Sequence, residues 1–220
     1  MKDAGNERMI DFVYFDLGQV IIPVLRDSVA VALSRVSDLS LGRLKKIMRH
    51  GYTDKYRSFW DSVKAFDRGQ IYPYEFYGQV KRRLRLTVGF KKFIKIWQMM
   101  LGLDDRFVRL IKALRAQGIR TGIISDLCIV HHDRFWQMMS REQFDITLFS
   151  FEYGVMKSDG DGVIFERAIQ AANLPPSRVF FIDDRYVNVL AAVMCKLRVH
   201  YYENDFEVLE DHLRSLGVKI

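Results

Sequence analysis

The sequence DFVYFDLGQV at residues 11–20 is a short apolar run that carries an acidic residue, Asp16, near its end. Near-continuous apolar character over Asp11–Leu17 is typical of a strand in a parallel sheet that is covered on both faces. Four later runs share this character, namely RTGIIS (120–125), ITLFSF (146–151), VFFI (179–182) and RVHYY (198–202). We therefore expect these five runs to form buried parallel strands.

Helical patterns separate the predicted strands. They cover residues 105–117, which Gly118 ends, and residues 162–172, 188–196 and 206–216. Because each strand is followed by a helix, the pattern predicts an α/β fold with a doubly wound, Rossmann-like parallel sheet. In such a sheet, ligands bind beyond the carboxyl ends of the strands.

One long interval interrupts this alternation. Between the first strand and the helix at Asp105, residues 24–103 contain no convincing strand, and apolar residues recur at helical spacing at 29–36 and 90–97. A structureless loop of this length is improbable in a compact domain. We therefore expect a core domain formed by residues 1–23 and 102–220 and a helical cap domain formed by residues 24–101, with hinges near 22–25 and 101–104.

The composition excludes several classes of protein. Of 220 residues, 49% are hydrophobic and 28% charged, which is unlike a disordered, collagenous or membrane-spanning chain. The two cysteines, Cys128 and Cys195, are too few for a disulfide scaffold, which favours a reducing compartment. Residues 1–8 are polar and resemble no signal sequence. We expect a cytoplasmic protein without a targeting or membrane segment.

The positive charge is concentrated in the predicted cap. The chain carries a net +7, yet residues 26–100 hold 17 basic against 6 acidic side chains, or +11, and the rest is −4. Solvated helix faces explain such a distribution, and recruitment of an anionic substrate is an alternative. No nucleic-acid motif accompanies the charge, which alone predicts only salt-sensitive, non-specific binding. We therefore expect no specific nucleic-acid partner. No feature of the sequence selects an oligomeric state.

Polar side chains with complementary chemistry stand at the ends of the predicted strands. They are Asp16 after the first strand, Ser125 after the second, Lys157 after the third, and Asp183 with Asp184 after the fourth. This set suits phosphoryl transfer through an aspartyl-phosphate, since a carboxylate nucleophile needs its negative charge and that of the phosphate neutralised. Mg²⁺ favours one or two carboxylates together with water and substrate oxygens, so we expect Mg²⁺ between Asp16 and the Asp183/Asp184 pair. Lys157 and Ser125 would bind the remaining phosphoryl oxygens.

These motifs, in this order, resemble the haloacid dehalogenase (HAD) superfamily over essentially the whole chain. The helical insert after the first strand is similar to the C1 cap of that superfamily, as is the stretch FDRGQI at 66–71 followed by Glu75 and Phe76. The Phe-Asp-Leu-Gly-x-Val form of the first motif most resembles a bacterial branch of sugar-phosphate phosphatases that includes glucose-1-phosphate phosphatase.

The resemblance implies a role for each matching residue and a small phosphorylated metabolite as substrate. Asp16 would be the nucleophile, with Ser125 and Lys157 as further catalytic residues. Apart from the resemblance, we expect Asp126 and Arg185 to join Ser125 and Lys157 in binding the substrate, and the alternative for Arg185 is to pair with a neighbouring carboxylate. The metal ligands would be Asp16, the main-chain carbonyl of Gly18, Asp184 by direct contact, and Asp183 through water or by orienting a partner.

Gly18 departs from the superfamily pattern. Most phosphatases of the superfamily have a second Asp at this position, which protonates the leaving group and then activates water. General acid–base help of this kind is commonly worth about 10²–10⁴-fold in rate. We therefore hypothesise a preference for phosphates whose leaving groups need little protonation, such as aryl, acyl or anomeric sugar phosphates. The alternative is a catalytically attenuated relative that acts as a ligand-binding or regulatory protein.

Other potentially reactive residues have simpler interpretations. His131 and His132 are adjacent, and neighbouring residues on a helix point in different directions, so we do not expect them to share a metal ion. Cys128 is interpreted as a small buried hydrophobe. Trp60, Trp97 and Trp136 are interpreted as core residues because they lie at helical spacing from other apolar residues.

Overall fold

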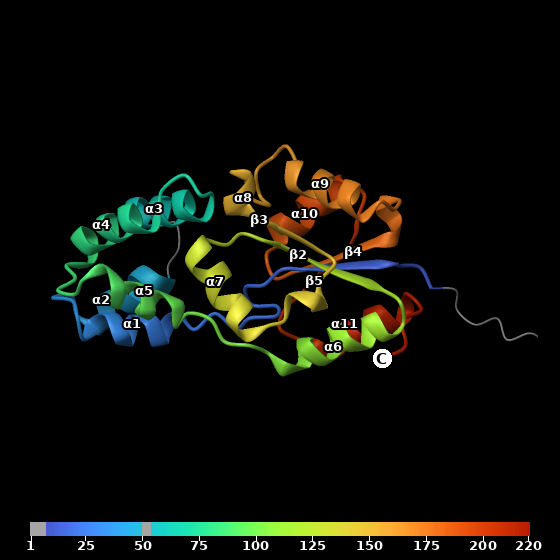
Figure 1. Cartoon of the computed structure of the whole chain (residues 1–220), viewed down its shortest axis with the longest axis horizontal. Helices are drawn as coiled ribbons and strands as arrows, with labels where there is room; N and C mark the ends of the chain where they lie inside the picture. The colour runs from blue at the N-terminus through green and yellow to red at the C-terminus, as the bar shows by residue number, and fades with distance from the viewer. Residues whose placement is uncertain (1–7, 50–53) are drawn as a thin grey trace, which may run out of the picture.

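A five-stranded parallel sheet forms the centre of the molecule (Figure 1). The structure is a computed structural model that describes residues 8–49 and 54–220. The strands are β1 (Phe12–Phe15), β2 (Arg120–Ser125), β3 (Ile146–Phe149), β4 (Val179–Asp183) and β5 (Arg198–Tyr201), in the order β3-β2-β1-β4-β5. The predicted fold class is confirmed. Most of the N-terminal stretch in which the sequence predicts no targeting signal, residues 1–7, lies outside the described residues.

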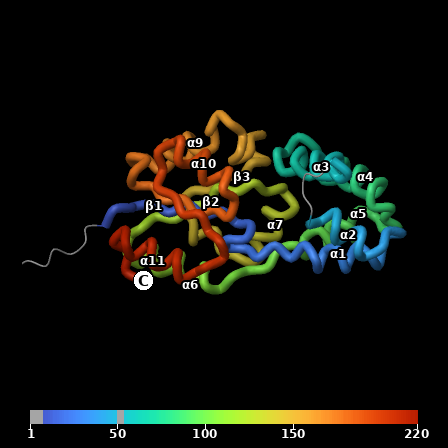
Figure 2. The backbone as a smooth tube through the Cα atoms, turned by 180° about the vertical axis from the view of Figure 1, so that it is seen from behind, coloured from blue at the N-terminus to red at the C-terminus, as the bar shows by residue number. Residues whose placement is uncertain are grey.

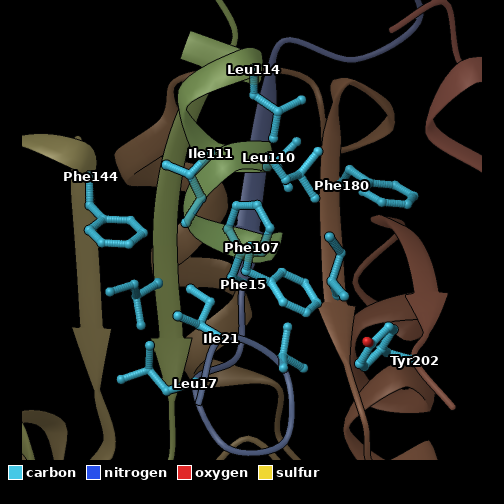
Figure 3. Close-up of a cluster of buried hydrophobic side chains, with 14 of the residues drawn as sticks. Phe15, Leu17, Ile21, Phe107, Leu110, Ile111, Leu114, Phe144, Phe180 and Tyr202 are labelled. Atoms are coloured by element: carbon cyan, nitrogen blue, oxygen red, sulfur yellow. The ribbon is translucent and has the colours of Figure 1, made fainter. Parts of the chain in front are cut away.

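Helices cover both faces of the sheet (Figure 1). On one face lie α6 (Asp105–Ala116) and α11 (Phe206–Ser215), and on the other lie α9 (Val163–Ala172) and α10 (Tyr186–Met194). Alternate residues of β1 point to opposite faces, since Phe15 packs with Phe107 of α6 whereas Tyr14 belongs to the cluster beneath α9. Figure 3 shows the first of these clusters, in which Phe15 and Phe180 meet the apolar side of α6.

Gly122 on β2 allows a close approach within the second cluster. A Cβ atom at this position would lie 2.6 Å from the Tyr14 ring and 2.6 Å from the carbonyl oxygen of Ile146. The Tyr14 hydroxyl in turn donates a hydrogen bond of 2.9 Å to the carbonyl oxygen of Ala168. Only glycine therefore fits between β1 and β3 at this point.

Within the described residues, five α-helices lie between β1 and α6, to one side of the sheet (Figures 1 and 2). They are α1 (Arg26–Ser34), α2 (Leu41–Arg49), α3 (Arg57–Asp67), α4 (Pro73–Leu84) and α5 (Phe90–Gln98). Their apolar faces form a hydrophobic cluster of their own, which includes Val29, Leu44, Phe66, Phe76 and Phe93. We call residues 26–98 the helical cap. None of the helices in the described part of the chain has the length and apolar character to cross a bilayer.

The helical cap contacts the rest of the molecule at several points. Val24 and Leu101 form an antiparallel bridge where the chain enters and leaves the cap. Helix α7 (Ile129–Met138) packs against α5, and Cys128 joins the cap cluster as a fully buried residue, as predicted. At the end of α3, a Cβ atom on Gly69 would lie 2.4 Å from the carbonyl oxygen of Phe151. The cap is therefore docked against the sheet-containing part through both α5 and α3.

Several element boundaries differ from the prediction. The strand predicted at 146–151 ends at Phe149, because Ser150 begins the short helix α8 (Ser150–Tyr153) and its hydroxyl donates to the carbonyl oxygen of Asp67. The helix predicted at 188–196 starts earlier, at Tyr186. Single 3₁₀ turns occupy Asp54–Tyr56, Arg141–Gln143 and Pro176–Arg178.

Candidate active site

The predicted strand-end residues gather at the carboxyl edge of the sheet. Asp16 follows β1 directly, and Ser125 and Asp183 are the last residues of β2 and β4. Lys157 lies in the segment after α8. All four are buried, with Lys157 1% and Asp183 0% exposed. Parallel strands place their carboxyl ends on one edge, which explains why residues far apart in the sequence meet here.

Lys157 joins two of the carboxylates. Its Nζ atom lies 2.7 Å from Oδ1 of Asp16 and 2.6 Å from Oδ2 of Asp183. Burial alone would lower the pKa of Lys157, but Asp16, Asp183 and Asp126 raise it, so the ammonium keeps its charge at neutral pH. The ammonium is held at the point where β1 and β4 end.

Asp183, the last residue of β4, is held in place by residues at the start of helix α10. The main-chain N–H of Arg185 donates to Oδ1 of Asp183 at 2.8 Å, and Nδ2 of Asn188 donates to both carboxylate oxygens at 3.0 and 3.1 Å. Asn188 is itself fully buried at the start of α10. The carboxyl group of Asp183 is therefore held in a fixed orientation beneath the site. Asp184 is half-buried and faces the cavity described below.

Three carboxylates form a group that can hold a metal ion. Asp16, Asp183 and Asp184 each offer an oxygen, and these oxygens lie within 4.8 Å of one another. Burial, together with repulsion from Asp183 and Asp184, raises the pKa of Asp16 to about 7, although Lys157 lowers it. One ammonium does not neutralise three carboxylates. A hard divalent cation with a preference for oxygen ligands fits this donor set.

The site opens into a cavity of about 350 Å³ between the sheet edge and the helical cap. Every predicted site residue except Asp183 lines it, namely Asp16, Gly18, Ser125, Asp126, Lys157, Asp184 and Arg185. Asp183 lies behind Lys157 and reaches the site through the ion pair. The cap contributes an apolar wall and several charged groups, namely Arg26, Met48, Arg49, Trp60, Val63, Lys64, Asp67 and Trp97.

Asp126 connects two of the predicted substrate-binding residues. Its Oδ1 atom accepts a hydrogen bond of 2.9 Å from the main-chain N–H of Lys157, and its Oδ2 atom lies 3.9 Å from Nη1 of Arg185. The side chain of Asp126 is 10% exposed, whereas that of Arg185 is 47% exposed. Asp126 therefore positions the Lys157 segment, and the half-exposed Arg185 lines the cavity beside it.

The cap residues in the cavity were not predicted as site residues. Trp60 and Trp97 line the cavity, and Trp97 also belongs to the cap cluster, as expected of a core residue.

Nε2 of His131 donates to the carbonyl oxygen of Trp97 at 3.1 Å, and burial lowers the pKa of His131 to about 4. His132 instead contacts Asp133 at 3.0 Å. The two histidines thus face different partners.

The sequence matches a known family over most of its length. The family model described as haloacid dehalogenase-like hydrolase matches residues 13–195, which include every predicted site residue. The chain belongs to this family. The resemblance expected from the strand-end motifs is therefore confirmed, and the protein is a HAD-like hydrolase.

Solved structures with the same fold include several HAD proteins. The HAD family enzyme BT-2542 from Bacteroides thetaiotaomicron superposes with a TM-score of 0.73 at 20% identity, over 91% of this chain and 98% of that chain. A predicted HAD-like hydrolase from Porphyromonas gingivalis gives 0.73 at 20% identity, over 94% and 98%. The L-2-haloacid dehalogenase from Xanthobacter autotrophicus gives 0.63 at 17% identity, over 94% and 83%. At these identities the likeness establishes the fold.

Proposed function

We propose that this HAD-like hydrolase is a Mg²⁺-dependent phosphatase of small phosphorylated metabolites that forms an aspartyl-phosphate on Asp16. The observation that carries the proposal is the buried ion pair of Asp16 with Lys157 on the floor of the cavity, beside the group of three carboxylates. A nucleophilic carboxylate next to a fixed ammonium is suited to attack an anionic phosphoryl group.

Each residue of the site has a distinct part in the proposed reaction. Asp16 attacks phosphorus, and Lys157 and Ser125 bind the phosphoryl oxygens. Asp16, Asp183, Asp184 and the main-chain carbonyl of Gly18 would hold Mg²⁺, which supplies charge neutralisation for the phosphoryl group. Asn188 keeps Asp183 oriented, and Arg185 contacts the part of the substrate nearest the cavity mouth.

A solved neighbour supports the choice of metal and ligand. Wild-type BT-2542 has been crystallised in complex with magnesium and inorganic phosphate, at a TM-score of 0.72 and 19% identity over 91% of this chain and 98% of that chain. The donor set of the present chain, three carboxylates close together, suits the same cation.

The substrate preference follows from Gly18 and from the cap. Unless another residue supplies the proton that position 18 lacks, we expect aryl, acyl or anomeric sugar phosphates to be turned over best, in line with the sugar-phosphate branch that the first motif resembles. We infer that residues 24–101 act as a cap over a core of residues 1–23 and 102–220, which excludes water and selects the substrate. Residues 1–7 and 50–53 of these ranges lie outside the described residues.

The free thiols Cys128 and Cys195 suit a cytoplasmic location.

A screen of phosphate monoesters tests this function. The wild-type protein is assayed with Mg²⁺ and with a chelator, beside Asp16→Asn and the control Asp61→Asn, an exposed residue of α3. We expect Mg²⁺-dependent phosphate release that Asp16→Asn abolishes and Asp61→Asn leaves unchanged. Full turnover by Asp16→Asn, or equal turnover with the chelator, contradicts the proposal.

A second candidate function is ligand binding without turnover, as in a regulatory relative. The observation that favours it is Gly18, which brings no side chain to the place where the superfamily usually has an acid. Beryllofluoride or vanadate with Mg²⁺ mimics the phosphorylated or transition state. Saturable binding of these anions together with no release of phosphate from any ester in the screen would favour this function.

A further inference from the structure

The space around Gly18 is open, yet no side chain at that position can donate a proton. A Cβ atom there would lie 3.6 Å from Cγ2 of Val24 and 4.0 Å from Oδ2 of Asp16, which are ordinary contacts. Among the described residues, four carboxyl groups line the cavity, those of Asp16, Asp67, Asp126 and Asp184. With Asp16 as nucleophile and Asp184 as metal ligand, Asp67 and Asp126 remain as possible acids.

Asp67 is brought to the cavity by firm contacts between the cap and the core. It is the last residue of α3, and its carbonyl oxygen accepts a hydrogen bond from the hydroxyl of Ser150. The next residue, Arg68, pairs with Asp159 at 2.6 Å. Gly69 then packs directly on the main chain of Phe151. The segment that carries Asp67 is therefore fixed in relation to the sheet edge.

The surroundings of Asp67 favour its protonated form. Burial raises the pKa of Asp67 well above its usual value, repulsion from Asp126 raises it further, and Arg68, which is held by Asp159, lowers it. Cys128 also faces Asp67, and its buried thiol is neutral because burial raises the pKa of that thiol. These surroundings therefore favour the protonated carboxyl group more than those of an exposed aspartate do.

Asp126, the other carboxyl group, is bonded to the core: burial raises its pKa, and the contacts with Lys157 and Arg185 oppose that rise. Its Oδ1 atom accepts from the main chain of Lys157, and Lys157 and Arg185 both favour its carboxylate form, against burial and Asp183. Its Oδ2 atom is buried and accepts no hydrogen bond within residues 8–49 and 54–220. The two carboxyl groups thus line the same cavity, one from the cap and one from the core.

We propose that Asp67 is the general acid and base of the reaction, in place of the carboxyl group missing at position 18. This inference rests on the proposed phosphatase function. As an oxygen of Asp16 bonds to phosphorus, the bond from phosphorus to the leaving oxygen breaks, and that oxygen takes its electron pair and the proton of Asp67. Water then attacks the aspartyl-phosphate, gives its proton to the Asp67 carboxylate, and releases phosphate and the Asp16 carboxylate.

The leaving group distinguishes this role from a structural one. Asp67→Asn is compared with wild type on a simple alkyl phosphate and on p-nitrophenyl phosphate, whose leaving group needs no proton. The parameter is kcat/KM, since it includes the release of the leaving group. We expect a loss of about 10²–10⁴-fold on the alkyl phosphate and a change of at most a few-fold on p-nitrophenyl phosphate. Retained activity on p-nitrophenyl phosphate also shows that the variant is folded.

Two further variants sharpen the test. Gly18→Asp, placed in the Asp67→Asn background, should restore much of the alkyl phosphatase activity because the space at position 18 accepts a side chain. Asp126→Asn should lower alkyl phosphatase activity less than Asp67→Asn does, and Asp61→Asn, on the exposed side of α3, should change neither rate.

An equal loss on both substrates, or no loss on the alkyl phosphate, overturns the role of Asp67. Failure of Gly18→Asp to restore any alkyl phosphatase activity also counts against it. Failure of the underlying function is distinct, because the wild-type protein would then release phosphate from neither ester.

Discussion

The core and the helical cap contribute to the same cavity in different ways. In the core, Asp16, Lys157 and Asp183 form a buried network in which one ammonium contacts two carboxyl groups. The cap instead supplies an apolar wall, with Trp60 and Trp97, and one carboxyl group, Asp67. Under the proposed function, the core would determine which bond is broken, whereas the cap would determine which leaving group is accepted and how it is protonated.

The largest effect is expected where the core network is broken. In Lys157→Met, Asp16 and Asp183 lose the cation that lies 2.7 and 2.6 Å away. We expect kcat/KM to fall by about 10²–10³-fold, as when one group that stabilises transition-state charge is removed. Without Mg²⁺, unfolding in urea should show a loss of about 3–5 kcal/mol, because two buried carboxylates are left without their cation.

The control for this variant is Lys112→Met, an exposed lysine on α6. It should leave both the rate and the unfolding midpoint unchanged. If Lys157→Met kept the wild-type kcat/KM, the core would not carry the chemistry, and the division between core and cap would be wrong.

A smaller effect is expected where the cap meets the core. Gly69 has φ +67° and no room for a Cβ atom beside the carbonyl oxygen of Phe151, whereas Gly154 has φ +72° and open space. Gly154→Ala should cost about 1 kcal/mol of unfolding free energy from backbone strain alone. Gly69→Ala should cost about 1–3 kcal/mol more, because the added methyl group forces the neighbouring main chain apart.

Kinetics separate this docking effect from general instability. Gly69→Ala should raise KM because the end of α3 moves away from the cavity, while Gly154→Ala should leave KM unchanged. Equal unfolding free energies and equal KM values for the two variants would show that contact between α3 and α8 does not position the cap.

A pH-dependent loss of stability is expected at the junction between α5 and α7. Burial lowers the pKa of His131 to about 4, below the usual value of 6.5. As the pH falls from about 6.5 to about 4, the unfolded chain takes up a proton that the folded chain resists, so stability decreases by about 3 kcal/mol. In His131→Asn, urea unfolding between these pH values should show a smaller decrease. An unchanged slope would contradict a buried, neutral His131.

The smallest effect is expected from the basic surface of the cap. Lys91 and Lys92 are exposed at the start of α5 and do not line the cavity. Reversing both charges, Lys91→Glu with Lys92→Glu, should lower kcat/KM at low ionic strength by no more than about threefold, and added salt should remove the difference. A loss that persists in high salt would show that these lysines bind the substrate directly.

The core site could be predicted because strand ends are visible in the sequence. Apolar runs locate the strands, and parallel strands bring Asp16, Ser125 and Asp183 to one edge whatever lies between them. The network among them could not be predicted, because it depends on where the loop after α8 places Lys157. Asn188, which orients Asp183, stands in the sequence only as a polar residue in an apolar helix.

The contribution of the cap to the cavity could not be predicted from the sequence in the same way. Helical periodicity indicates that Trp97 is buried, but not that the buried face borders a cavity shared with the core. The stretch at residues 66–71 resembles the superfamily, yet the approach of Asp67 to Asp126 depends on tertiary contacts of Ser150 and Gly69. The predicted end of β3 was wrong because Ser150 begins helix α8, where its hydroxyl donates a hydrogen bond to the carbonyl oxygen of Asp67.

The most direct test of the account is detection of the phosphorylated residue. The protein is mixed with Mg²⁺ and p-nitrophenyl phosphate, quenched in acid during turnover, digested and analysed by mass spectrometry. We predict a phosphoryl group on the peptide that contains Asp16, with none in Asp16→Asn, which should also have lost turnover. A phosphoryl group on another residue, or full turnover by Asp16→Asn, would contradict the account.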